Sequence, residues 1–241
     1  MKFHETSFDE YINNTRNIDL HPELREFEES IPNKPINFKN MIIYGPSGVG
    51  KYTQMLRFIK KYSPSELKYD KKMGLQADKY EHTYRIVDKH YEIDVSLLGC
   101  NSKSVWHDVY MQIVDIVSLK PGKFGIIVCK NFHAIHSELL ENFYSYIQQY
   151  ANELSPFQIK FIILSEHISF IPKNILYNAQ IVNVKRPSAE LYKLLGLPDN
   201  INPQYLLNLK EIPMIQSVND PSDSPQEIFD NVCETLVDKI A

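Results

Sequence analysis

Short apolar runs alternate along the chain with segments in which apolar residues recur at helical spacing. The runs that suit strands cover residues 40–44, 124–129, 159–164 and 181–184, and residues 90–95, which alternate polar and apolar, also look like a strand. The segments with helical spacing lie between them, over residues 51–62, 105–117 and 139–147. Strands that alternate with helices indicate βαβ units with right-handed crossovers. The pattern therefore predicts an α/β fold with a parallel sheet flanked by helices.

The pattern also divides the chain into three parts. Residues 1–40 form a polar, acidic N-terminal leader with helical spacing at 8–12 and 22–27. Residues 41–188 carry the strands and helices of the α/β domain, interrupted by a charged segment at 66–90 that indicates a hairpin or an irregular excursion. Beyond Pro187 the pattern changes to leucine-rich pieces separated by prolines, and we expect residues 189–241 to form a small helical tail.

A phosphate-binding motif lies between the first predicted strand and the first predicted helix. The run Gly45-Pro46-Ser47-Gly48-Val49-Gly50-Lys51 matches the first seven positions of G-x-x-x-x-G-K-[ST], the Walker A motif of P-loop NTPases. Its glycines let successive N–H groups face one phosphate, the following helix adds its positive end, and the lysine reaches the terminal phosphates. We expect ATP or ADP to bind at Gly45, Pro46, Ser47, Gly48, Val49, Gly50, Lys51, Tyr52 and Thr53.

The eighth position of the motif is Tyr52, where a serine or threonine normally binds Mg²⁺ through its hydroxyl. A phenol hydroxyl lies several ångströms further from the backbone and cannot take the same place. Thr53 is one residue further along the helix and points about 100° away. The motif alone therefore makes Mg²⁺ binding doubtful.

The buried strand that should supply acidic residues does not supply them. P-loop ATPases end such a strand in an Asp that holds Mg²⁺, but the run 126–129 ends in Lys130 and Asn131. A lysine cannot coordinate a cation, and an asparagine cannot take a proton from water. Asp94, at the end of the 90–95 run, is the other acid so placed and could substitute. We expect no catalytic and no metal-binding residue, and weak or no ATP hydrolysis by the isolated chain.

Several motifs resemble the small subunits of sliding-clamp loaders, the replication factor C family of AAA+ proteins. Residues 44–53 are similar to that family's YGPxGxGKxT, and 90–95 with Gly99-Cys100-Asn101 resembles its "YHLE" followed by "GN". Residues 137–143 and 182–188 resemble the helix after the acidic strand and the end of the ATPase core. The resemblance covers roughly residues 36–188. It implies an AAA+-type fold, partners among other AAA+ or replication subunits, and DNA contact through the assembly.

The chain departs from this family where the family acts on ATP. The family's sensor Asn falls on Ser165, and its Ser-Arg-Cys arginine finger falls on Tyr177-Asn178-Ala179. About 50 residues follow the core, which we expect to form a reduced lid without a full collar domain. The resemblance therefore implies a nucleotide-binding but hydrolysis-deficient subunit of such an assembly.

Composition and charge indicate where in the cell the protein would reside. The net charge is −4, and no apolar run is long enough to span a membrane. Cys100, Cys129 and Cys233 are widely spaced and form no CxxC, so we expect reduced thiols. These features favour an intracellular, soluble protein of the cytoplasm, the nucleus or a viral replication compartment, with no membrane contact. The lysines that could form a local basic surface read better as a solvated face; they are Lys60, Lys61, Lys68, Lys71 and Lys72.

Two further side-chain signals favour ordinary structural roles. His133 and His136 lack a third metal ligand, and Cys129 has no evident base partner.

Two other functions stay open. A small P-loop kinase or phosphotransferase would need Mg²⁺ and an arginine-rich lid, and residues 110–185 contain no arginine. A structural interaction module would keep the phosphate loop only as a relic. Titration with ATP distinguishes that module from a nucleotide-binding subunit.

Overall fold

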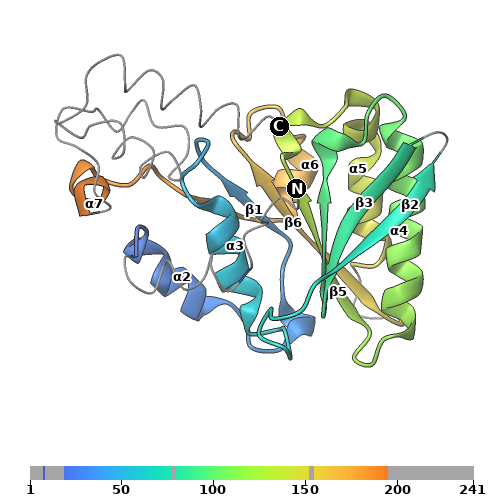
Figure 1. Cartoon of the computed structure of the whole chain (residues 1–241), viewed down its shortest axis with the longest axis horizontal. Helices are drawn as coiled ribbons and strands as arrows, with labels where there is room; N and C mark the ends of the chain where they lie inside the picture. The colour runs from blue at the N-terminus through green and yellow to red at the C-terminus, as the bar shows by residue number, and fades with distance from the viewer. Residues whose placement is uncertain (1–7, 9–18, 78–79, 152–154, 195–241) are drawn as a thin grey trace, which may run out of the picture.

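A single mixed sheet organises the molecule. The computed structural model describes residues 8, 19–77, 80–151 and 155–194. Seven strands form the sheet in the order β2-β3-β4-β5-β6-β1-β7 (Figure 1). Their bounds are β1 Met41–Tyr44, β2 Lys71–Ala77, β3 Tyr80–Val87, β4 His90–Asp94, β5 Phe124–Lys130, β6 Gln158–Ser165 and β7 Gln180–Asn183.

The predicted α/β fold is confirmed, but the sheet is not wholly parallel. Strands β4, β5, β6, β1 and β7 pair in parallel, whereas β2 and β3 are antiparallel to each other and β3 is antiparallel to β4. The charged segment at 66–90 is thus a hairpin that extends the sheet. Its polar character fits this place, because Lys71 and Lys72 are exposed on the edge strand β2.

The helices connect the strands as the spacing predicts. The three long ones match the predicted segments: α3 Lys51–Lys60, α4 Ser102–Leu119 and α5 Ser137–Gln149. The shorter helical elements are η1 Pro22–Leu24, α2 Arg25–Ser30, η2 Pro35–Asn37, η3 Val95–Leu97, η4 Phe132–Ala134, α6 Lys173–Tyr177 and α7 Ala189–Leu194. Beyond α7, the predicted helical tail lies outside the described residues.

Each face of the sheet has its own apolar core. On β5, Ile126 and Val128 pack with α3, while Ile127 and Cys129 pack with α4 and α5. Figure 1 shows α3 on one side of the sheet and α4 and α5 on the other. Because both faces are covered, the strand reads as a continuous apolar run rather than an alternating one.

Part of the leader packs against α3. Arg57 on α3 reaches Asp19 with Nη1 at 3.3 Å from Oδ1 and Glu28 with Nη2 at 2.6 Å from Oε2. Near these ion pairs, the rings of Phe27 and Phe58 meet edge to face, with their centroids 5.3 Å apart. The leader from residue 19 onward therefore contacts the helix that follows the phosphate loop.

Candidate functional site

The phosphate loop joins β1 to α3 at the carboxyl edge of the parallel strands. Gly48 and Gly50 have φ of 71° and 93°, a left-handed conformation that suits glycine, and Gly50 caps α3. The backbone N–H groups of residues 47–50 donate to no other group among the residues that the structure describes. Clustered N–H groups of this kind attract an anion, and the helix dipole adds to the effect.

Lys51 holds its ammonium group over the loop. Its Nζ donates to the carbonyl oxygens of Gly45 at 2.7 Å and Pro46 at 2.6 Å. Burial lowers the pKa of Lys51, and the nearby carboxylate of Glu166 partly offsets that effect. The positive charge therefore lies at the mouth of the N–H cradle, where the motif predicts it.

The start of the loop is fixed between two strands. The N–H of Gly45 donates to the carbonyl oxygen of Ser165 at the end of β6, at 3.3 Å. A Cβ at position 45 would lie 2.1 Å from the carbonyl oxygen of Val184, just after β7. Glycine is required here because the two backbones approach too closely for any side chain.

The leader contributes a histidine that the sequence did not single out. His21 is 1% exposed, and its Nε2 lies 2.7 Å from the carbonyl oxygen of Val49 in the loop. Since a carbonyl only accepts hydrogen bonds, Nε2 carries the hydrogen and donates it. No motif marks His21 in the sequence, because its role depends on the packing of the leader against the loop.

Tyr52, at the eighth motif position, points its hydroxyl at a buried carboxylate. The hydroxyl lies 2.8 and 2.9 Å from the two carboxylate oxygens of Glu92 on β4. His90 approaches the same carboxylate, with Nε2 3.2 Å from Oε1. The ammonium of Lys130, at the end of β5, lies 5.2 Å from the centroid of the Tyr52 ring. These four side chains are called the Glu92 cluster below.

The Glu92 cluster keeps a charge in a buried place. Glu92 is 3% exposed, and burial raises the pKa of its carboxyl. The hydrogen bond and charge of His90, the charge of Lys130 and the hydrogen bond from Tyr52 lower that pKa, and together they outweigh burial. The carboxylate is therefore ionised at neutral pH and is compensated by its neighbours. Sequence reasoning missed Glu92 because the pattern of a strand does not indicate that one of its acidic side chains is buried.

The residues at this edge do not fit a magnesium ion. The Tyr52 hydroxyl is engaged by Glu92, and the strand-end position carries the cation of Lys130. Asn131 donates from Nδ2 to Oδ2 of Asp94 at 2.8 Å. Asp94 also accepts from the N–H and the hydroxyl of Ser96, so its carboxylate is occupied by protein donors. Within the described ranges, no group of three or more metal-ligating side chains is placed to hold an ion.

Ser165 and Asn178, which the sequence comparison with clamp loaders matched to the sensor and the arginine finger, hydrogen-bond to nearby groups of the protein. The hydroxyl of Ser165, in the sensor position, donates to the carbonyl of His167 at 2.6 Å. Asn178, in the arginine-finger position, donates to the hydroxyl of Tyr144 at 3.1 Å and to the carbonyl of Asn174 at 2.8 Å. Neither side chain carries a positive charge that could stabilise phosphate.

The remaining candidate residues also have structural surroundings. Of the two candidate metal ligands His133 and His136, His133 pairs with an acid, its Nε2 lying 3.8 Å from Oε1 of Glu166. Cys129 is fully buried, and burial raises the pKa of its thiol well above the usual range. A thiol that stays protonated is a poor nucleophile.

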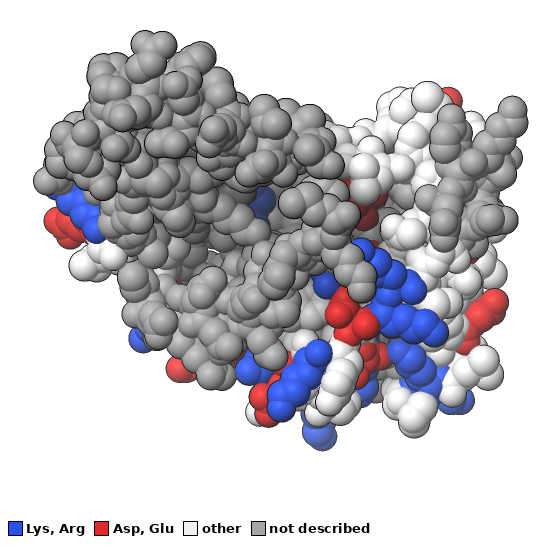
Figure 2. Space-filling view, in the orientation of Figure 1, with Lys and Arg blue, Asp and Glu red and all other residues white. Residues whose placement is uncertain are grey.

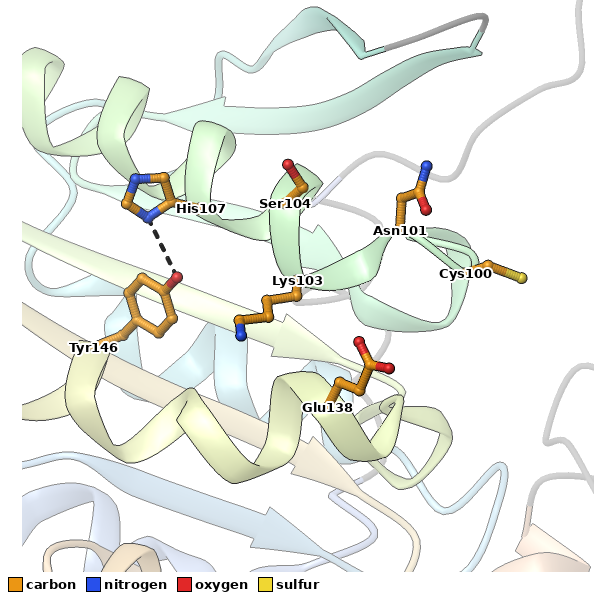
Figure 3. A pocket seen from close by; sticks show the side chains of 7 residues that line it. All are labelled: Cys100, Asn101, Lys103, Ser104, His107, Glu138 and Tyr146. Atoms are coloured by element: carbon orange, nitrogen blue, oxygen red, sulfur yellow. Dashed lines mark hydrogen bonds between the residues drawn. The ribbon is translucent and has the colours of Figure 1, made fainter.

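A hollow of about 450 Å³ lies between the start of α4 and α5 (Figure 3). His107 and Tyr146 contact each other at one end of it, with Nδ1 3.3 Å from the phenol oxygen. The hollow is lined by Cys100, Asn101, Lys103, Ser104, His107, Glu138 and Tyr146. None of these residues belongs to the phosphate loop or to the Glu92 cluster.

Charge on the visible face is mixed. Figure 2 shows lysine and arginine side chains interspersed with acidic ones over the described part of that face. Among the described residues, Arg85 on β3 pairs with Asp70 at 2.6 Å. This arrangement agrees with a solvated face rather than with a continuous basic surface for nucleic acid.

Comparisons with known proteins find the chain similar to solved structures alone. No protein-family model and no curated protein matches the sequence. The chain is similar to the RuvB Holliday junction branch migration motor of Thermotoga maritima, at 14% identity and a TM-score of 0.43, over 90% of this chain and 65% of that one. It is also similar to a mutant of the same RuvB, at 14% identity and a TM-score of 0.42, over 79% of this chain and 52% of that one.

A third similar structure is PCH-2 of C. elegans, at 14% identity and a TM-score of 0.46, over 97% of this chain and 66% of that one. The chain thus matches between about half and two thirds of the length of these solved chains. RuvB and PCH-2 are AAA+ ATPases. At these scores the likeness adds no detail to the site, and the P-loop α/β assignment rests on the strand order and the phosphate loop of the chain itself.

One negative finding concerns membranes. Across the described residues, no helix combines the length and the apolar character that crossing a bilayer requires.

The Glu92 cluster makes the first testable prediction. Tyr52→Phe removes a hydrogen bond to a buried carboxylate and should lower the free energy of unfolding by about 1–3 kcal/mol in urea denaturation at pH 7. The matched control is Tyr69→Phe, at a residue 75% exposed, where we expect a change within about 0.5 kcal/mol. Equal stabilities of the two variants would contradict the role given to the Tyr52 hydroxyl.

Proposed function

We propose that this chain is a nucleotide-binding subunit of the AAA+ type that holds ATP or ADP with little or no hydrolysis of its own. We further propose that it works in a replication-associated assembly similar to a sliding-clamp loader. The observation that carries the proposal is the set of N–H groups of residues 47–50, which have no acceptor among the described residues and lie beside Lys51 at the start of α3. Neighbouring N–H groups that are left without protein acceptors beside a lysine and a helix start suit an anionic phosphate.

The residues proposed to contact nucleotide are those of the phosphate loop. The N–H groups of 47–50 and of the first turn of α3 would hold the phosphates, with Lys51 reaching them from the side. Gly45 keeps the loop close to Val184, and His21 fixes the Val49 carbonyl. This support lets the loop keep one shape before and after binding, which lowers the entropic cost of binding.

Poor hydrolysis follows from the residues at the ends of β4 and β5. Activating a water molecule needs a base, and the position after Lys130 carries an asparagine that donates to Asp94. The same missing acids weigh against a small P-loop kinase, which also needs Mg²⁺ for transfer. A module with a relic loop is the alternative that absent binding would reveal.

Calorimetric titration with ATP and with ADP tests the central proposal. We expect binding at or below millimolar nucleotide, and Lys51→Ala should weaken it at least about tenfold, as losing a charge-assisted phosphate contact does. The matched control is Lys60→Ala, at the other end of α3, where Nζ lies 3.6 Å from Oε2 of Glu66. No heat of binding to the folded wild type would leave the relic module as the better description.

Hydrolysis is tested by phosphate release from ATP. The wild type should turn over at background, because a general base alone typically contributes about 10²–10⁴-fold. Combining Tyr52→Thr, Lys130→Asp, Asn131→Glu and Glu92→Gln should raise the rate, the last change preventing an uncompensated buried carboxylate. Glu92→Gln alone is the control. A wild-type rate of about 1 s⁻¹ that Lys51→Ala abolishes would contradict this part of the proposal.

The proposed assembly is tested by its contacts. Exposed apolar side chains on α6 and β7 support an interaction surface, since Tyr177 is 81% and Ile181 46% exposed. Crosslinking in native extract should capture another AAA+ or replication subunit, with DNA reached through that assembly. Size-exclusion chromatography with light scattering measures self-association. A monomer in both experiments, with and without nucleotide, would refute the need for a partner.

A further inference from the structure

We propose that Lys130 takes the place of the magnesium ion and contacts the terminal phosphate of the bound nucleotide, so that the site selects metal-free ATP or ADP. This inference rests on the proposed nucleotide binding and specifies the form of the ligand. It concerns a lysine at the position where P-loop ATPases carry a metal-holding acid.

The strand places Lys130 on the correct face. Side chains alternate along β5, so Lys130 faces the same side as Ile126 and Val128, which pack with α3. That is the face from which the phosphate loop leads into α3. Lys130 is also the last residue of β5, at the carboxyl edge where the loop lies. Its backbone alone therefore directs the side chain toward the phosphate loop.

The contact with Tyr52 shows where the ammonium group of Lys130 lies relative to the phosphate loop. Lys130 Nζ lies 5.2 Å from the centroid of the Tyr52 ring, and Tyr52 directly follows Lys51 in the first turn of α3. In P-loop ATPases, the residues that match positions 52 and 130 together hold Mg²⁺. Here the same two positions touch each other as a cation over an aromatic ring. The cation is thus supplied by the protein in the region where a metal would lie.

Glu92 attracts the Lys130 ammonium group by charge and leaves its hydrogen-bond donors available. The carboxylate receives hydrogen bonds from Tyr52 and His90, so Lys130 is its partner by charge rather than by a direct hydrogen bond in the structure. An ammonium group has three donors. Lys130 can therefore keep its attraction to Glu92 and still donate to a phosphate oxygen. Together with Lys51, it brings two positive charges to a triphosphate in place of a divalent ion.

A simpler role for Lys130 would be to neutralise Glu92 alone. The two roles differ in one respect: a neutralising lysine becomes dispensable once Glu92 is made neutral, whereas a phosphate-binding lysine does not. The double variant Lys130→Met/Glu92→Gln removes both charges together and leaves no buried ion unpaired. It therefore keeps the fold while it tests the phosphate contact, and its thermal unfolding midpoint checks that it is folded.

The experiment is calorimetric titration of ATP and of ADP into each variant, once with excess EDTA and once with Mg²⁺. The wild type should bind ATP in EDTA at least as tightly as in Mg²⁺. Compared with Glu92→Gln alone, the double variant should lose about tenfold or more in ATP affinity in EDTA, the usual effect of removing one charged hydrogen bond. Glu92→Gln alone should bind ATP more tightly than the wild type, because it removes the competing negative charge. Lys103→Met, an exposed lysine on α4, is the control for net charge.

Three outcomes decide the matter. A lower ATP affinity in the double variant than in Glu92→Gln, with Lys103→Met unchanged from the wild type, supports the proposal. Equal ATP affinity in the double variant and in Glu92→Gln, or wild-type binding that requires Mg²⁺, overturns the role of Lys130 while leaving nucleotide binding intact. Absence of any binding by the wild type, with or without metal, instead overturns the proposed function on which this inference rests.

Discussion

An ionised carboxylate buried beside an apolar face is the constraint around which this edge of the molecule is arranged. Glu92 lies on the α3 side of the sheet, where its partner in the β5 register is Val128. A charge in such surroundings costs several kcal/mol unless donors and opposite charges surround it. Tyr52, His90 and Lys130 provide them from three separate elements. The start of α3, the start of β4 and the end of β5 are thereby held together.

This constraint gives one physical account of two substitutions that look unrelated in the sequence. A tyrosine in the eighth motif position and a lysine at the strand end each remove a metal ligand. In the structure they lie next to each other and share one carboxylate. Each of the two side chains makes a contact that involves the other, the Lys130 ammonium lying over the Tyr52 ring. The altered positions form a unit with its own charge balance.

The sequence predicted the elements that leave a regular apolar pattern, but not the contacts that bring residues from different elements together. Continuous apolar runs located β1, β5 and β6, since these strands are buried on both faces, and helical spacing located the long helices, which bury one face. The pattern does not distinguish the hairpin β2–β3 from an irregular excursion, because a charged edge strand has little periodicity. Glu92 and His21 were missed, since each has a partner 28 or more positions away, Tyr52 for Glu92 and Val49 for His21. The proposed nucleotide contacts themselves stay predictions.

The bond between His21 and the loop has a consequence for how signals could pass through the chain. A peptide group cannot turn its carbonyl without also turning the N–H of the next residue, because the unit is planar. The carbonyl of Val49 accepts from His21, and the N–H of that same peptide belongs to Gly50 in the cradle. Any rotation there therefore changes the anion site and the leader's anchorage in one movement. By thermodynamic reciprocity, any effect of the leader's contacts on the affinity of the cradle for an anion is matched by an equal effect of the anion on those contacts.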